Sequence, residues 1–234
     1  DLVMDNPHYN INGVHYYQEG GLDYLLISVH DNDKVGTQTF SKSDIIRLQV
    51  DVNGDDPAHP YVSAVNSIAL FDTIIADDKN VDIVALTARG LGDDEPANDR
   101  ILFSFSNDSA TLGGNPFDKA EVIKYDPNTG EYSLIFDADD ILPDNPNLVL
   151  DCLAVLPESD PRDPRLLLSF NVDPIKGYDG GPIKSQDIAI WDPGEDGEPN
   201  TIDDSIILHI SMCEETTVIG GGITVGIISW EISL

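Results

Sequence analysis

The feature that most constrains the fold of this chain is an internal repeat. One strand-like segment occurs in three versions, which are DYLLISVHD (23–31), DRILFSFSND (99–108) and PRLLLSFNVD (164–173). A second matching segment follows each of them, and its versions are SDIIRLQVD (43–51), AEVIKYDP (120–127) and QDIAIWDP (186–193). Repetition at a period of about 65–76 residues indicates an array of equivalent supersecondary units.

The spacing within the repeat is kept as well. From the serine that ends the first segment to the acidic residue that opens the second, the separations are 16, 17 and 18 positions, at Ser28–Asp44, Ser104–Glu121 and Ser169–Asp187. A separation that drifts by one residue per copy indicates one connection of variable length, because loops absorb insertions more readily than strands do. Similar apolar runs precede and follow these segments, so the repeat predicts units of four short strands.

The fold class predicted from these runs is all-β. The runs are short, are rich in Ile, Val, Leu, Phe and Tyr, and are bounded by Asp, Asn, Gly and Pro, as is typical of strands joined by turns. No long stretch has helical periodicity. We expect a single repeat domain over 1–234, with units near 10–72, 81–138 and 150–211 and an extra strand at 222–232.

Four-stranded antiparallel units in series favour a β-propeller-like array, because radial closure removes exposed sheet edges. Propellers close with about four to eight blades, whereas this chain supplies about three units. We expect the chain either to be part of a larger ring or to meet a second copy in a dimer-completed six-bladed ring. The strand at 222–232 would complete a neighbouring blade or cap the array. A β-sandwich and a β-solenoid are the alternatives.

The charge of the chain decides which partners suit it. With 43 acidic residues against 12 basic ones the formal net charge is −31, which argues against binding to nucleic acid or to anionic lipid. No apolar run is long enough to predict a membrane-spanning helix. The chain starts at Asp1 without an apolar leader, and we expect a mature secreted or extracellular protein or a trimmed chain.

The loop WDPGEDGEPNTIDDS at 191–205 is the strongest candidate for a cation site. Calcium takes about six to eight oxygen ligands, and Gly194 and Gly197 permit the tight curvature that would bring carboxylates together. Positions 1, 3, 5, 7 and 12 of a calcium loop fall on Asp192, Gly194, Asp196, Glu198 and Asp203. The expected cofactor is Ca2+, and the candidate ligands are Asp192, Asp196, Glu198, Asp203 and Asp204.

The same loop carries a resemblance to known proteins. DPGEDGEPNTIDD resembles the D-P-G-x-D-G-x-x-x-T-x-D-D calcium-type loop of secreted bacterial proteins, and the LLLSF…DI…YDPxTG pattern resembles a bacterial β-propeller-like repeat. The resemblance covers roughly 23–211 and implies that Asp192, Asp196, Asp203 and Asp204 bind the metal. Gly194 departs from the pattern, so a carbonyl or a water would replace that ligand.

The equivalent connections of the first two units differ from this loop. In the second unit, YDPNTGEYS at 125–133 predicts a compact hairpin that needs no ion, with Gly130 at a positive φ. In the first unit, DVNGDDPAHP at 51–60 offers Asp51, Asn53 and Asp55 as ligands of a second calcium site but lacks a distal carboxylate. An Asx-rich turn that bonds its own backbone is the alternative there.

The loops at the opposite ends of the strands are the candidate binding surface. If strands alternate in direction, the connections that start near residues 30, 106 and 171 lie on one face, with Asp77, Asp139 and Asp144 nearby. They recur as acidic and Gly-rich segments. Ordinary solvent loops have the same composition, so both interpretations remain open.

Motifs for catalysis are not found. G-x-S-x-G, H-E-x-x-H and the P-loop pattern do not occur, and the five histidines do not cluster. We expect hydrogen-bonded structural roles for His15, His30 and His209, and Trp191 and Trp230 are expected in the core. Cys152 and Cys213 fall on strands that a radial unit would separate, so buried free thiols and a disulfide both remain open.

Together these observations favour a calcium-stabilised extracellular binding or adhesion module, with a carbohydrate or a protein as ligand and self-association as an option. A metal-dependent hydrolase of lactonase or phosphoesterase type is the alternative, and it rests on fold analogy alone. A structural segment of a surface assembly is the third hypothesis. An enzyme is less favoured than a binding module.

Overall fold

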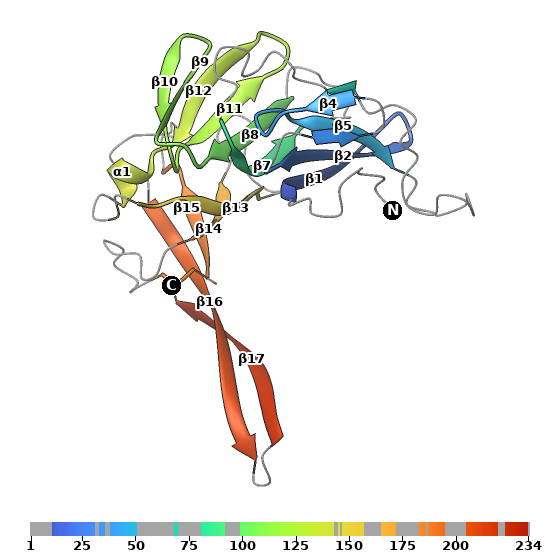
Figure 1. Cartoon of the computed structure of the whole chain (residues 1–234). Helices are drawn as coiled ribbons and strands as arrows, with labels where there is room; N and C mark the ends of the chain where they lie inside the picture. The colour runs from blue at the N-terminus through green and yellow to red at the C-terminus, as the bar shows by residue number, and fades with distance from the viewer. Residues whose placement is uncertain are drawn as a thin grey trace, which may run out of the picture.

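The structure is a computed structural model that describes residues 11–30, 33–35, 38–50, 68–69, 81–91, 99–142, 145, 147–156, 165–171, 183–185, 187–194, 205–219 and 223–233. Three main antiparallel sheets hold their strands in chain order (Figure 1). The all-β prediction is therefore confirmed. One helical turn, α1 (Ala138–Ile141), accompanies the strands in this part of the chain.

Each sheet corresponds to one repeat unit. Unit 1 contains β1 (Ile11–Glu19), β2 (Leu22–Val29), β5 (Ile46–Val50) and β6 (Ile68–Ala69). Unit 2 contains β7 (Ile83–Arg89), β8 (Arg100–Phe105), β11 (Val122–Asp126) and β12 (Glu131–Phe136). Unit 3 contains β13 (Leu150–Val155), β14 (Leu166–Phe170), β15 (Ile188–Asp192), β16 (Ser205–Ile219) and β17 (Ile223–Ser233).

The third sheet departs from the expected four strands. β16 continues to Ile219, beyond the expected end at 211, and β17 pairs with it antiparallel from Ile223 onward. The strand expected at 222–232 thus extends the sheet of its own unit. Figure 1 shows the resulting two-stranded ribbon projecting away from the three sheets.

Small hairpins occupy two of the connections that were expected to form the candidate binding surface. β3 (Asp33–Val35) pairs with β4 (Gln38–Phe40) in unit 1, and β9 (Ser109–Leu112) pairs with β10 (Asn115–Asp118) in unit 2. In β9 the side chains alternate between exposed and buried, and Gly113 and Gly114 both have positive φ at its turn. A Gly-Gly pair between alternating residues is a hairpin signal that the sequence analysis missed.

The repeat extends to a detail that the sequence did not reveal. The first strand of each unit has a register shift, between Ile11 and Gly13, between Ile83 and Ala85, and between Leu150 and Cys152. One extra residue at the same place in three strands is a conserved β-bulge within the chain. After the bulge, the repeat serines lie opposite equivalent residues in the pairs Gly13–Ser28, Ala85–Ser104 and Cys152–Ser169.

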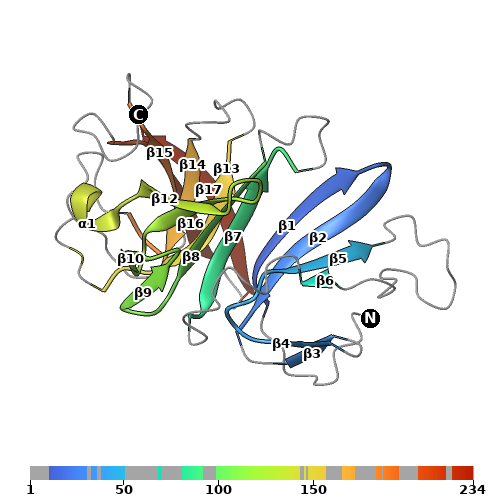
Figure 2. The same cartoon turned by 90° about the horizontal axis from the view of Figure 1, so that it is seen from above.

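The three sheets pack side by side along these first strands. β1 contacts β7, and β7 contacts β13, so the sheets fan out from neighbouring inner strands (Figure 2). Two apolar clusters fill the spaces between them, one between units 1 and 2 around Phe103 and one between units 2 and 3 around Trp191. Among the described strands, none of the sheets closes on itself.

Close approach of backbones fixes the first of these contacts. A Cβ built on Gly13 would lie 2.7 Å from Leu86 Cβ and 3.0 Å from Ser28 Oγ. Only glycine therefore allows β1 to lie this close to β7. Ala85, the equivalent residue in unit 2, is 1% exposed.

The described side chains also test the expectations for single residues. Trp191 is fully buried and packs edge-on against Phe136, with ring centroids 5.9 Å apart, as expected of a core anchor. Cys152 is a free thiol, but it is exposed on β13 and not buried. The side chains of Cys213, Trp230 and His209 lie outside the described residues. Within the described part of the chain, no helix has the length and apolar character needed to cross a membrane.

Candidate functional site

The third strands of units 2 and 3 end in the same way. In unit 2, Asp126 Oδ1 accepts hydrogen bonds from the backbone N–H groups of Asn128 and Thr129, at 2.9 and 3.3 Å. Gly130 donates its N–H to the Asp126 carbonyl at 2.8 Å with a φ of 74°. The compact hairpin with a left-handed Gly130 is therefore confirmed.

In unit 3, Asp192 holds the equivalent place. Its Oδ1 accepts the Gly194 N–H at 2.9 Å, and Gly194 has a φ of 83°. An arginine at the start of the neighbouring strand pairs with the aspartate in both units: Arg100 lies 3.1 Å from Asp126 Oδ2, and Arg165 Nε lies 2.7 Å from Asp192 Oδ2. Both oxygens of Asp192 are thus engaged within the chain.

This arrangement bears on calcium binding by Asp192. A cation at this carboxylate would share it with the Arg165 guanidinium or displace that group, and the Arg165 side chain is 54% exposed and can turn to solvent. Among the described residues, no three His, Cys, Asp or Glu side chains come together to hold a metal ion. The other candidate ligands lie outside the described residues, namely Asp196, Glu198, Asp203, Asp204, Asp51, Asn53 and Asp55.

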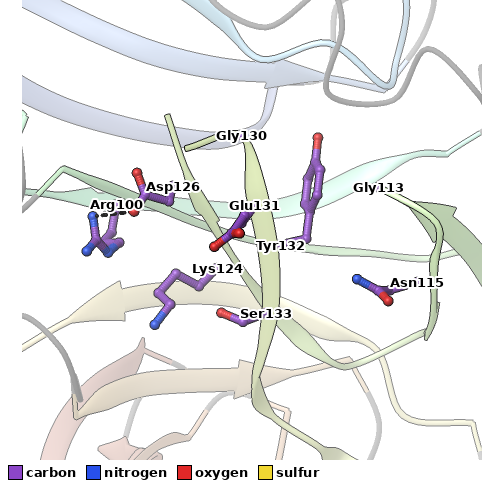
Figure 3. Close-up of a pocket in the computed structure, with 9 residues that line it drawn as sticks. All are labelled: Arg100, Gly113, Asn115, Lys124, Asp126, Gly130, Glu131, Tyr132 and Ser133. Carbon is purple, nitrogen blue, oxygen red and sulfur yellow. Dashed lines mark ion pairs between the residues drawn. The ribbon is translucent and has the colours of Figure 1, made fainter. Parts of the chain in front are cut away.

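A pocket of about 460 Å³ lies beside the Asp126 hairpin at the outer edge of the second sheet (Figure 3). It is lined by Arg100, Gly113, Asn115, Lys124, Asp126, Gly130, Glu131, Tyr132 and Ser133. In the register of the two strands, Lys124 lies opposite Ser133 and Asp126 lies opposite Glu131. Directly paired residues share a sheet face, so these four polar side chains gather on one side of edge strand β12.

The opposite side of β12 supplies the aromatic part of the pocket. Tyr132 packs against Tyr125 with ring centroids 5.0 Å apart, and its burial raises the pKa of the phenol, so the ring stays neutral. A Cβ built on Gly113 would lie 2.7 Å from Tyr132 Cδ2. The glycine turn of the β9–β10 hairpin therefore rests directly on this ring and brings Asn115 to the pocket.

The electrostatic character of the pocket is mixed. Arg100 is held by Asp126, while Lys124 and Glu131 contribute one charge of each sign, with the Ser133 hydroxyl and the Asn115 amide beside them. Such a lining offers both hydrogen-bond donors and acceptors. No sequence motif marks this site, because its residues come from four separate strands and two hairpin turns.

A second polar cluster joins units 1 and 2 at the other end of the strands. Asp82 accepts a hydrogen bond from Asn12 Nδ2 at 2.9 Å and pairs with His30 Nδ1 at 3.0 Å. Burial raises the pKa of the Asp82 carboxyl, and the nearby His30 and Lys42 partly oppose that rise. His30 and His15, which lies 3.3 Å from the Thr87 hydroxyl, both make the hydrogen bonds expected of structural histidines.

The acidic residues of the repeat spacing have one role in all three units. Asp44, Glu121 and Asp187 each accept the backbone N–H of the residue three positions earlier, at 2.7, 2.8 and 2.7 Å. Burial, together with the charges of Asp137, Asp118 and Asp139, raises the pKa of Glu121 to about 7. A carboxyl with such a pKa suits a general acid, but its recurrence in equivalent turns identifies a structural role.

The expected binding surface is partly described. Asp139 and Asp108 line one small pocket of about 180 Å³ together with Asp118, Lys119, Ala120, Asn145 and Leu148. Lys119 already pairs with Asp108 at 2.9 Å. Asp77, Asp144 and the connection at 172–182 lie outside the described residues.

Comparisons with known proteins add no family to this geometry: no protein-family model, no curated protein and no solved structure matches the chain. Its function has to be argued from its own residues.

Proposed function

We propose that this chain is a calcium-stabilised, secreted binding module with a carbohydrate ligand, built as a propeller-like array of three units. The propeller-like arrangement is supported by the consecutive contacts of β1, β7 and β13 and by the strand order within each sheet. Three units form only part of a ring, so the array is open in a single chain. This is the architecture that the repeat predicts.

The pocket at β12 is the observation that carries a binding function. It combines a lysine, a carboxylate, a serine hydroxyl and an amide within a volume of about 460 Å³, and ligand sites commonly have volumes of about 300–1,000 Å³. Sugar hydroxyls donate and accept hydrogen bonds at once, so they match a lining that offers both kinds of partner. A carbohydrate fits this chemistry better than a singly charged ligand does.

The loop that follows Asp192 is the proposed calcium site. The acidic spacing of 192–204 and its resemblance to calcium-type loops support an ion there, and Gly194 already turns the chain back toward the Asp192 carboxylate. A bound ion would brace the connection between β15 and β16. For a secreted protein we expect a dissociation constant of about 0.1–1 mM, as is typical of extracellular calcium modules.

Thermal unfolding with and without calcium, after chelation, tests the metal. A ligand that binds only the folded state raises the unfolding midpoint by mass action. We expect a calcium-dependent rise that Asp196→Ala/Asp203→Ala loses. The double variant Asp108→Ala/Glu131→Ala removes the same charge from exposed positions and should keep the rise. Equal responses of all three proteins to calcium would contradict a site in this loop.

A panel of immobilised glycans tests the ligand. We expect the wild type to bind a subset of the panel. Lys124→Ala/Glu131→Ala should bind at least about 10-fold more weakly, because each substitution removes a charged hydrogen-bond partner of the ligand. Lys184→Ala, an exposed lysine in unit 3, serves as the matched control. Binding that is absent from the wild type, or unchanged in the pocket variant, would refute the carbohydrate proposal.

A further inference from the structure

The two end units of the array expose surfaces that equivalent residues bury elsewhere in the chain. We call the face of a sheet that points toward the following unit its trailing face, and the opposite one its leading face. The trailing face of unit 1 meets the leading face of unit 2, and the trailing face of unit 2 meets the leading face of unit 3. The bulges and the serines at 28, 104 and 169 align the three units position by position.

The trailing face of unit 3 is the more exposed copy of a buried surface. Leu26 and Leu102 are 0% and 1% exposed, whereas Leu167, their equivalent in unit 3, is only half-buried. Ala85 is 1% exposed, whereas its equivalent Cys152 is exposed. Ser169 and Ile188 repeat this difference, since both are half-buried and their equivalents are fully buried.

The leading face of unit 1 shows the complementary difference on β1. Ile11, Val14 and Tyr16 are 45%, 58% and 47% exposed. Their equivalents on β7 are Ile83, Leu86 and Ala88, at 0%, 2% and 5%. The rest of this face is covered, because Ile27 and Val29 on β2 are almost fully buried. The exposed part is thus the strip of β1 where a preceding inner strand would lie.

We propose that the trailing face of unit 3 binds the β1 strip of a second copy of this chain, head to tail, in a closed dimer. Both halves of the contact are on one chain, which already forms the same pairing between units 1 and 2 and between units 2 and 3. Two copies of three units would then meet through two equivalent interfaces. A head-to-tail contact closes into a ring where the rotation between successive units closes and continues as a filament where it does not, so the closed dimer requires six equal steps.

The equivalence predicts one contact in detail. Gly13 lies against Leu86 within the chain. In the dimer, Cys152 takes the place of Gly13, and Val14 of the second copy takes the place of Leu86. Because a Cβ at position 13 would lie only 2.7 Å from Leu86 Cβ, the two strands must lie further apart in the dimer than β1 and β7 do in the chain. A separation wider by about 1 Å places the Cβ atoms of residues 152 and 14 within the range of about 3.5–4.5 Å that a disulfide requires.

Disulfide trapping tests this contact. The chain has two cysteines, so a Cys213→Ser background leaves Cys152 as the single native thiol. In that background, Val14→Cys should give a covalent dimer under mild oxidation, with peptides containing Cys152 and residue 14 joined in the mass spectrum. Gln18→Cys, about 13 Å further along the exposed side of β1, is the matched control and should not be trapped.

Sedimentation at low and high ionic strength supplies the second measurement. We expect a dimer that Val14→Asp weakens at least about 10-fold, and that tightens with salt because each copy carries a net charge of −31. Val14 is exposed in the single chain, so the variant should still fold. A monomer at all concentrations without a 14–152 disulfide would refute the interface, and a ladder of larger oligomers would refute closure.

Discussion

The contact between units 1 and 2 and the contact between units 2 and 3 join equivalent strands in different ways. In the first contact, Gly13 lets the backbone of β1 lie close to Leu86, and the buried Asp82 is held by Asn12 and His30. The second is dominated by apolar packing, with Trp191 against Phe136 at its centre. Each unit therefore keeps the bulge, the serine and the carboxylate that accepts the backbone N–H three residues earlier, while the surfaces between units differ.

The largest expected effect is at the apolar contact. Trp191→Ala should lower the free energy of unfolding by about 3–5 kcal/mol, because it leaves a large cavity beside Phe136. Chemical denaturation measures this change, and Trp191→Phe is a milder control that keeps an aromatic ring. A loss below about 1 kcal/mol would show that Trp191 does not anchor the interface.

The close contact between Gly13 on β1 and Leu86 on β7 should make stability sensitive to a single added methyl group. Gly13→Ala should cost about 1–3 kcal/mol of unfolding free energy, because the new Cβ meets Leu86 Cβ and both atoms are fixed by backbone. The test is a double-mutant cycle with Leu86→Gly, in which the cost of Gly13→Ala should shrink. If the two substitutions have additive effects on the free energy of unfolding, the cost of Gly13→Ala does not come from the contact with Leu86.

The shared turns can be tested through Glu121. A carboxyl whose pKa is raised to about 7 when folded binds its proton more tightly in the folded state, so its contribution to stability falls as pH rises from about 4.5 to 7. Glu121→Gln keeps an acceptor for the Asp118 N–H and should remove this fall, gaining about 1–2 kcal/mol relative to wild type at pH 8.

Urea unfolding across this pH range measures the difference between the two proteins. Glu131→Gln, at an exposed carboxylate, is the matched control and should leave the pH profile unchanged. Parallel profiles for wild type and Glu121→Gln would contradict a raised pKa at Glu121.

The smallest expected effect on stability is at the arginine pairs. Arg165→Met should change the free energy of unfolding by less than about 1 kcal/mol, because the pair with Asp192 is partly exposed. If the Asp192 carboxylate binds calcium, the same change should raise calcium affinity a few-fold, measured by titration calorimetry, since the competing cation is gone. Arg100→Met in unit 2 should leave calcium binding as it was.

The sequence was sufficient for features that depend on local chain chemistry and insufficient for features that depend on contacts between strands. Repetition of strand-like runs predicted four strands per unit, and the Gly130 turn followed from YDPNTG, because both depend on local chain chemistry. The bulge before Gly13 was not predictable, since a one-residue shift depends on the register between strands. The β9–β10 hairpin could have been predicted, because Gly113 and Gly114 are a local signal for its turn.

The candidate site was harder to predict for a physical reason. Arg100, Asn115 and Lys124 reach one pocket only after β8, the β9–β10 hairpin and β11 have folded together, so no sequence motif marks them. Abundant acidic residues drew attention to the calcium-type loop instead. Of its candidate ligands, Asp192 is placed, and its ion pair with Arg165 was not foreseen because it links adjacent strands.

The order of strands within each sheet has a consequence for how the chain is made. Because every main sheet is assembled from segments in chain order, the described strands of unit 1 are complete by Ala69, before β7 begins at Ile83. During synthesis at about 5–20 residues per second, each unit can therefore emerge from the ribosome complete and serve as the template on which the next one docks.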